Sequence, residues 1–296
     1  MCAVRAGAST LKEEKTMKYV FYNNFSGDGH TEGLAASLKS VYGEDMTLVN
    51  TAELPDIAAF CRGLGEGDDI VICGGDGTIN RFVNMVDADA LKCGVLYLPA
   101  GTGNDFANDV GMKGAKEPFA ITDYIKNLPT VVVNGKTYKF INGVGYGIDG
   151  YCCEVGDKKK LAGKKPNYTS IAILGLLFGY KPKDATVIVD GVEHHFKRAW
   201  LAPTMFGRYY GGGMMATPNQ KRGSDELSVM LFHGGGKLKT LMAFPSIFEG
   251  KHVENKMVTV MTGKEITVRF AEPAPLQVDG ETIVGVSEYT AYSSER

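Results

Sequence analysis

The sequence has no long apolar run, almost no net charge and no Cys-x-x-Cys pair. Its longest uncharged apolar run, residues 171–180, is ten residues long, about half of what a membrane-spanning helix needs. A formal net charge of −2 gives no overall attraction to nucleic acid or anionic membranes, so such contacts would need a local patch. We therefore expect a cytoplasmic protein that binds no nucleic acid and whose membrane contact would be peripheral, at the inner face.

The six cysteines show no disulfide-like spacing, and a chain of 296 residues can bury a core without disulfides. The adjacent Cys152 and Cys153 could be a redox pair, although two small buried residues are the commoner case. Reduced thiols are therefore expected.

Glycine is abundant and gathers after apolar runs. Residues 70–73 form a short apolar run, typical of a buried parallel strand, and GGDGTIN (residues 74–80) follows. Glycines here can take positive φ and let backbone N–H groups approach a ligand. Thr78 and Asn80 stand where a helix would begin, and helix N-termini attract phosphate. The stretch predicts a phosphate-binding loop, in which Asp76 suggests a metal ion; the alternative is an ordinary strand-to-helix turn.

The first half of the chain repeats this order of strand, glycine loop and helix. We expect strands at residues 18–22, 46–50, 70–73 and 93–98, and helices at residues 31–41, 54–64 and from the GGDGT loop to about Val86. Three strand ends carry loops suited to phosphate: residues 23–30, GGDGT, and PAGTGNDFA at residues 99–107. Together they predict a parallel sheet with helices on both faces and a ligand at the carboxyl ends of the strands.

The pattern changes near Val131. Asn134-Gly135 and Asp190-Gly191 are flanked by β-branched or alternating residues, which is the strongest short-range signal for a β-hairpin. Further strands are expected at residues 227–232, 257–262 and 266–270, and one helix at residues 167–180. The second half therefore predicts an antiparallel β domain.

Five motifs, in their order and spacing, resemble the diacylglycerol kinase catalytic-domain family, which includes bacterial lipid kinases and relatives acting on sphingosine and ceramide. They are GGDGT (74–78), PAGTGNDFA (99–107), NGVGYGIDG (142–150), the stretch 211–229 and VDGE (278–281). Neither GxGxxG with a following acid nor GxxxxGK[ST] is present. The resemblance implies an α/β three-layer nucleotide-binding domain at residues 17–132, a lipid-binding β-sandwich at 133–296 and an active site between them. Residues 1–16 are expected to be a flexible extension or an upstream start.

The resemblance also implies ATP, Mg²⁺ and a lipid alcohol as ligands. Nucleotide contacts are expected from Asn23, Ser26, Gly27, Gly74, Gly75, Asp76, Gly77, Thr78, Gly101, Thr102, Asn104 and Asp105. Asp76 and Asp105 would also bind the metal. The alternative for Asp105 is an N-cap of the following helix, a position that Asn104 could fill equally well.

Asp279 and Glu281 would carry the chemistry. In the family the first acid of VDGE acts as base and the second supports it, which fits the need of a lipid hydroxyl for a carboxylate that accepts its proton. The alternative is a plain hairpin turn at Asp279-Gly280, as expected at Asp190-Gly191.

Two motifs depart from the family pattern. Asp225 stands where relatives bind a structural Mg²⁺, but Glu226 follows it in place of the usual glycine. In the first loop, Asn24 replaces the proline of Asn-Pro-x-Ser-Gly.

The densest basic run is Lys158, Lys159, Lys160, Lys164 and Lys165. It predicts either a solvated loop or a contact with an anionic surface. The apolar side chains that follow it, Leu174, Leu176, Leu177 and Phe178, are expected in the core.

The sequence thus predicts an ATP- and Mg²⁺-dependent lipid kinase with diacylglycerol as the leading acceptor. One alternative is an NAD kinase, which shares the GGDG loop and the two-domain plan but whose relatives lack the terminal Asp-Gly-Glu. Another is a nucleotide-sensing or lipid-carrying protein without turnover, against which the four carboxylates at 76, 105, 279 and 281 argue. Each of these three interpretations allows a homodimer.

Overall fold

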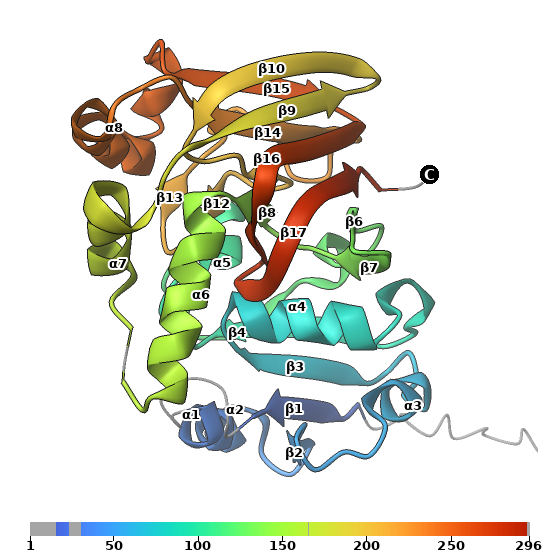
Figure 1. Cartoon of the computed structure of the whole chain (residues 1–296). Helices are drawn as coiled ribbons and strands as arrows, with labels where there is room; N and C mark the ends of the chain where they lie inside the picture. Colours follow the sequence, from blue (N-terminus) through green and yellow to red (C-terminus); the bar gives the residue numbers. More distant parts are fainter. Residues whose placement is uncertain (1–15, 24–30, 165, 295–296) are drawn as a thin grey trace, which may run out of the picture.

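The computed structural model describes residues 16–23, 31–164 and 166–294 (Figure 1). Most of the expected extension, Ser26, Gly27 and Lys165 lie outside these ranges. None of the helices in the described ranges is long and apolar enough to cross a membrane.

The first half builds a five-stranded sheet in the order β2-β1-β3-β4-β5. Its strands are β1 (Lys18–Tyr22), β2 (Met46–Asn50), β3 (Asp69–Gly74), β4 (Gly94–Pro99) and β5 (Phe119–Ala120). All are parallel except β5, which is antiparallel to β4. The four strands expected from the sequence are confirmed to within one residue at each end, because each is a short apolar run bounded by polar or glycine residues.

Helices cover both faces of this sheet. They are α1 (Thr31–Ser37), α2 (Lys39–Tyr42), α3 (Ile57–Arg62), α4 (Asp76–Met85) and α5 (Asp105–Asp109), with the 3₁₀ turns η1 (Ala88–Ala90) and η2 (Thr122–Tyr124). Apolar residues of α3 and α4 pack against Ile70 and Ile72, whereas α1 and its neighbour Leu38 pack against Val71 and Cys73. Because successive strand residues face opposite sides, this alternation confirms the three-layer arrangement.

The second half forms a ten-stranded sheet in which all pairs are antiparallel. Its strands are β6 (Thr130–Val133), β7 (Lys136–Lys139), β8 (Gly143–Tyr146), β9 (Lys183–Val189), β10 (Val192–Ala199), β11 (Thr204–Met205), β14 (Leu227–Phe232), β15 (Val258–Gly263), β16 (Glu265–Val278) and β17 (Glu281–Tyr292). The change from the first sheet to the second falls between β5 and β6, a few residues before the expected boundary.

One long strand, β16, joins the two halves of the second sheet. Its first part pairs with β9 and its last three residues pair with β8, with register shifts between Arg269 and Leu276. Tyr146 stacks on Phe270 at 4.1 Å and meets Tyr289 edge-on at 5.7 Å. The strand therefore connects β9 to β8 beside an aromatic cluster.

Both predicted hairpins are confirmed, and a third turn has the same backbone. The central residues have φ of 49° and 74° at Asn134-Gly135, 47° and 82° at Asp190-Gly191, and 46° and 96° at Asp279-Gly280. Positive φ at both central positions is the mark of a type I′ turn. Asp279 therefore lies in a hairpin turn, as the alternative interpretation of Asp279-Gly280 predicted.

The sequence predicted only one helix in the second half, and the structure has more. They are α6 (Ile148–Leu161), α7 (Tyr168–Leu174), a π-helix η3 (Gly175–Gly179), α8 (Lys237–Ala243), and the 3₁₀ helices η4 (Phe244–Glu249) and η5 (Lys251–Glu254). The helix expected at residues 167–180 is confirmed as α7 with η3, capped by Asn167, whose Oδ1 accepts from the Ser170 N–H at 2.9 Å.

Two expectations about this region are wrong. Lys158, Lys159 and Lys160 form the last turn of α6 and not a loop, a position where the helix dipole favours cations. Leu174 and Phe178 are 56% and 79% exposed, while Leu176 is buried. The apolar segment lies at the edge of the fold, so only one of its faces packs.

Candidate active site

The GGDGT loop carries the chain from β3 into α4, and its glycines are needed for close packing. None of Gly74, Gly75 and Gly77 has positive φ, so the expected backbone conformation is wrong. Instead, a Cβ on Gly74 would lie 2.2 Å from Oγ1 of Thr78, and one on Gly101 would lie 2.5 Å from Cα of Gly75. The two glycine loops touch backbone to backbone, which places Asp76 beside the PAGTGND loop.

Asp76 caps the short helix α5 from outside. Its carboxylate accepts from the backbone N–H groups of Asp105 at 2.9 Å and Phe106 at 2.8 Å. The capping role considered for Asp105 and Asn104 is therefore wrong. Asn104 stands at the N-cap with φ of 51° but makes no capping bond; its side chain binds the backbone of Gly101 at 3.0 and 2.7 Å and so closes the loop.

Asp105 points across to the second half of the chain. Its carboxylate oxygens accept from the N–H groups of Gly212 and Gly213, both at 2.7 Å. These residues have φ of 85° and 108°, a conformation that favours glycine. Asp105 is 5% exposed, and its burial raises the pKa of the carboxyl to about 6, with the charge of Asp76 adding to the increase.

This raised pKa gives a testable dependence of stability on pH. Between about pH 4 and 6 the folded protein holds a proton on Asp105 that the unfolded chain has released, so the free energy of unfolding should fall as pH rises. We expect the difference between wild type and Asp105→Asn to fall by up to about 3 kcal/mol across that window. Denaturant titrations of both proteins at pH 4, 5, 6 and 7 measure it; a constant difference would contradict the raised pKa.

Asp279 is held by four donors at the tip of the β16–β17 hairpin. Its carboxylate accepts from the N–H groups of Ile141 at 2.6 Å, Asn142 at 2.9 Å and Gly143 at 2.9 Å, and from Nδ2 of Asn80 at 2.8 Å. Burial raises the pKa of Asp279, while these donors act in the opposite direction. The side chain therefore joins the hairpin to α4 and to the start of β8, which an ordinary turn does not require.

Asn142 links the carboxylates of the two halves. Its Nδ2 donates to Oδ1 of Asp76 at 3.1 Å, and its backbone N–H donates to Asp279. Its Oδ1 accepts from Arg222 at 2.9 Å, and Nε of the same arginine donates to the buried Asp109 at 2.6 Å. Asp76, Asp105 and Asp279 thus belong to one hydrogen-bonded network.

The sequence interpretation placed Asn80 near the start of a helix without a contact of its own, and it assigned no role to Asn142 and Arg222. Asn80 and Asn142 stand within motifs quoted above, which was the available signal. Arg222 also stands in a quoted motif, the stretch 211–229, but its partners lie 80 and 113 residues away.

The carboxylates of Asp76 and Asp105 both face Gly103. A Cβ on Gly103 would lie 3.7 Å from Oδ2 of Asp76 and 3.5 Å from Oδ2 of Asp105, so one point beside this glycine is in van der Waals contact with both carboxylates. Within the described ranges, no cluster of three or more His, Cys, Asp or Glu side chains could hold a metal. Mg²⁺ in kinase sites commonly takes one or two carboxylates together with substrate phosphates, so the pair fits this ion.

Asp225, Glu281, Asn23, Ser26 and Gly27 were also expected to contribute to the site. Asp225 precedes β14 and forms an ion pair with Nζ of Lys264 at 3.0 Å. Glu281 is largely exposed, and its Oε1 lies 3.5 Å from NH2 of Arg81 on α4. Asn23 directly follows β1, whereas Ser26 and Gly27 fall outside the described residues.

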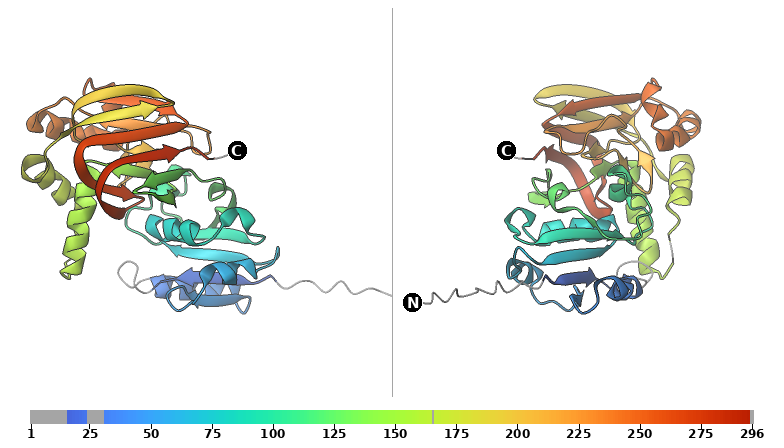
Figure 2. Two further views of the ribbon diagram at one scale, coloured as in Figure 1. Left: turned by 45° about the vertical axis from the view of Figure 1, so that its right-hand side comes forward. Right: turned by 180° about the vertical axis from the view of Figure 1, so that it is seen from behind.

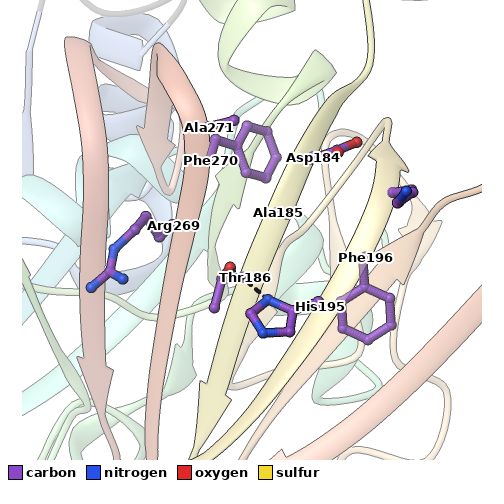
Figure 3. Close-up of a pocket in the computed structure, with 9 residues that line it drawn as sticks. Asp184, Ala185, Thr186, His195, Phe196, Arg269, Phe270 and Ala271 are labelled. Atoms are coloured by element: carbon purple, nitrogen blue, oxygen red, sulfur yellow. Dashed lines mark hydrogen bonds between the residues drawn. The ribbon is translucent and has the colours of Figure 1, made fainter.

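A shallow hollow between β9, β10 and β16 is distinct from the site (Figure 3). In it, Nδ1 of His195 lies 3.1 Å from Oγ1 of Thr186, while Nε2 pairs with Glu193 at 3.0 Å. His194 is less exposed than His195, which agrees with the expected alternation along the strand. The hollow holds none of the residues expected to bind nucleotide, metal or lipid.

Both halves of the chain match known protein families. Residues 18–135 match the diacylglycerol kinase catalytic domain, and residues 142–291 match the YegS C-terminal NAD kinase beta sandwich-like domain. A diacylglycerol kinase of Mycobacterium tuberculosis is 26% identical over 75% of each chain, and one of Bacillus subtilis is 24% identical over 76% of this chain and 74% of its own. A diacylglycerol kinase crystal structure from Bacillus anthracis shares the fold, with a TM-score of 0.60 and 18% identity over 94% of each chain.

Proposed function

Because the chain belongs to the diacylglycerol kinase catalytic-domain family, we propose that it is an ATP-dependent lipid kinase that phosphorylates the free hydroxyl of diacylglycerol to give phosphatidic acid. The observation that supports this proposal best is the meeting of Asp76, Asp105 and Asp279 in one network built from both sheets. Such a network can present carboxylates to a nucleotide on one side and to an acceptor on the other.

The nucleotide phosphates would bind at the start of α4. Among the described residues, none accepts from the backbone N–H of Asp76 or Gly77, and such groups at a helix N-terminus attract phosphate. The space around the ideal Cβ of Gly77 is open. Asp76 and Asp105 would hold Mg²⁺, which when bound supplies positive charge against the phosphate oxygens.

Asp279 would act as the general base. It would accept the proton of the acceptor hydroxyl while the hydroxyl oxygen bonds to the γ-phosphorus and the bond to the β-phosphate oxygen breaks, leaving ADP. The burial that raises its pKa makes it a better proton acceptor than an exposed carboxylate. Its four donors hold it in place but occupy most of the carboxylate lone pairs. One of these hydrogen bonds would therefore lengthen as the acceptor hydroxyl binds. Support from Glu281 stays a prediction.

The test is a transfer assay with labelled ATP and Mg²⁺. Diacylglycerol, sphingosine, ceramide and NAD are offered in parallel, each with an enzyme-free blank. We expect the label in phosphatidic acid, at a rate well above that for the other acceptors. Label in NADP would favour the NAD kinase alternative, and ATP binding without transfer to any acceptor would favour a sensor; either result overturns the proposal.

A further inference from the structure

Arg222 is a buried arginine that contacts both halves of the chain. Its side chain is 8% exposed. Its Nε donates to Asp109 of α5 at 2.6 Å, its Nη2 donates to Oδ1 of Asn142 at 2.9 Å, and its Nη1 donates to the carbonyl of Ile141. In both views of Figure 2 the second half of the chain lies above the first. This one side chain therefore connects α5, in the first half, with the segment that leads into β8, in the second.

Two buried aromatic rings fix the position of the Arg222 guanidinium. Its Cζ lies 5.0 Å from the centroid of the Phe106 ring and 5.3 Å from that of the Phe206 ring. These ring faces and the Asp109 carboxylate replace part of the water that burial removes, which lowers the cost of burying the charge. A guanidinium presents five N–H donors in one plane, whereas the ammonium of lysine is a compact point charge. Lysine at this position could not make the three hydrogen bonds at once.

A second arginine, Arg208, binds the same carboxylate from the other side. Its Nε donates to Oδ1 of Asp109 at 2.8 Å, its backbone N–H donates to the same oxygen at 3.2 Å, and its Nη2 donates to the Asp109 carbonyl at 2.6 Å. None of its hydrogen bonds within the described ranges reaches Asn142. The two arginines therefore share Asp109 and differ in the contact with Asn142, which only Arg222 makes.

The bond from Arg222 determines which end of the Asn142 amide faces Asp76. Asn142 is 3% exposed, so both ends of its amide need protein partners. Its Oδ1 accepts from Arg222, which leaves Nδ2 to donate to Oδ1 of Asp76 at 3.1 Å. The reverse orientation would set donor against donor at Arg222 and acceptor against acceptor at Asp76, because a guanidinium has no acceptor and an ionised carboxylate has no donor. Arg222 therefore holds the amide as a donor to Asp76.

Asn142 in turn helps to set the direction of the Asp76 carboxylate. Oδ1 of Asp76 accepts from Asn142 and from the N–H of Phe106, whereas Oδ2 accepts from the N–H of Asp105. Oδ2 is also the oxygen that lies beside Gly103 together with Oδ2 of Asp105. Two donors on one oxygen therefore turn the other oxygen toward the Asp105 carboxylate, where the cation of the proposed function would bind.

We propose that Arg222 is a positioning residue for the metal site: it holds the Asn142 amide as a donor to Asp76 and so keeps that carboxylate directed at the cation. The inference rests on the proposed function, because it assumes a divalent cation between Asp76 and Asp105. Residues that hydrogen-bond a metal ligand fix its orientation, and their replacement typically costs about 10 to 100-fold in metal affinity or activity. Arg222 would act in this way from a distance, through one intervening amide.

Two substitutions of Arg222 test the proposal. Arg222→Lys keeps a positive charge beside Asp109 but cannot also bind Asn142. Arg222→Met keeps an unbranched side chain between the two rings, and Asp109 retains Arg208 as its partner, so this variant leaves no buried carboxylate unpaired. The matched control is Arg208→Lys, which alters the contact with Asp109 and not the contact with Asn142. Asn142→Ala, alone and combined with Arg222→Met, tests whether the two residues act in one series. Melting curves verify that each variant folds.

Binding is measured without any lipid acceptor. Enhanced water-proton relaxation reports Mn²⁺ bound to the protein with a non-hydrolysable ATP analogue, and calorimetry with the analogue in EDTA reports the metal-free nucleotide. We expect both Arg222 variants to bind the Mn²⁺ complex about 10 to 100-fold more weakly and the metal-free analogue within about threefold of wild type. The control Arg208→Lys should stay within about threefold for both ligands. Asn142→Ala should lose about as much Mn²⁺ affinity as Arg222→Met, and the double variant should lose no more, because residues in one network are not additive.

The outcomes separate positioning from a structural role and from catalysis. Unchanged Mn²⁺ binding in a folded Arg222 variant overturns the proposal, and so does an equal loss for the Mn²⁺ complex and the metal-free analogue, which would indicate general loosening. Additive losses in the double variant would show that Arg222 does not act through Asn142, and absence of Mn²⁺ binding by wild type would leave no metal site to position; each also overturns it. Mn²⁺ binding that depends on Arg222, without transfer to any acceptor, supports positioning and overturns the proposed function.

Discussion

Replacing Asp279 with asparagine should lower the rate of phosphoryl transfer by about 10² to 10⁴-fold while leaving ATP affinity within about twofold of wild type. An amide cannot accept the proton of the acceptor hydroxyl, and loss of a positioned base typically costs that much. The backbone that we propose to bind phosphate, at the start of α4, does not include Asp279, so nucleotide binding should survive. Single-turnover transfer at saturating ATP and acceptor measures the first quantity, and titration calorimetry measures the second.

The matched control for this substitution is Asp190→Asn. Asp190 stands in the same kind of turn, and its Oδ1 accepts from the N–H groups of Lys264 and Glu265, both at 2.9 Å. Both variants turn an amide toward backbone donors, so each should lose about 1 to 3 kcal/mol of stability. Only Asp279→Asn should show the lower rate of phosphoryl transfer. Equal rates in the two folded variants, or more than half of wild-type activity in Asp279→Asn, would make Asp279 a structural turn residue only.

Gly75→Val and Gly77→Val should each weaken ATP binding by more than about 100-fold, equivalent to about 2.7 kcal/mol. The two act differently. A Cβ on Gly75 would already lie 3.1 Å from Cα of Gly101, so valine would push the two glycine loops apart. At Gly77 the space is open and α4 has begun, so valine should fit the helix and fill the volume that a phosphate would occupy. Titration calorimetry with ATP and Mg²⁺ compares the variants.

The matched control is Gly67→Val, which lies just before β3 and therefore at the opposite end of that strand. A Cβ there would be 3.7 Å from its nearest neighbour, an ordinary contact, and no positive φ is required. We expect unchanged ATP affinity for this variant. If Gly77→Val folds and also binds ATP as wild type does, the phosphates do not lie at the start of α4.

Local patterns determined the strands and turns of this protein. The first four strands are short apolar runs that end in glycine loops, and Asn-Gly or Asp-Gly pairs mark the hairpins. These features depend on interactions within a few residues, such as the ease with which Asn, Asp and Gly take positive φ. For that reason the bounds of the first four strands and the hairpin turns at Asn134-Gly135 and Asp190-Gly191 could be predicted without tertiary information, whereas β8, β11 and β17 were not expected and β16 is longer than the strand expected at residues 266–270.

Packing between distant segments determined the secondary structure where the sequence showed no local pattern, and α6 is the clearest example. It contains Gly150 and Gly156, which are poor helix formers, and no helix was expected there. A Cβ on Gly150 would lie 1.9 Å from the carbonyl oxygen of Pro275, and one on Gly156 would lie 2.6 Å from the Tyr168 ring. The glycines that weaken the helix locally are the residues that let it approach β16 and α7.

The residues of the candidate site were largely recognisable, but their connections were not. Asp76, Asp105 and Asp279 stand in motifs, whereas Asn142 joins the first to the third across 66 and 137 residues, and Gly212 meets Asp105 across 107. A motif identifies a side chain that can do chemistry. Which partners surround it, how deeply it is buried and therefore where its pKa lies depend on contacts between distant segments, and those form only when the two sheets pack together.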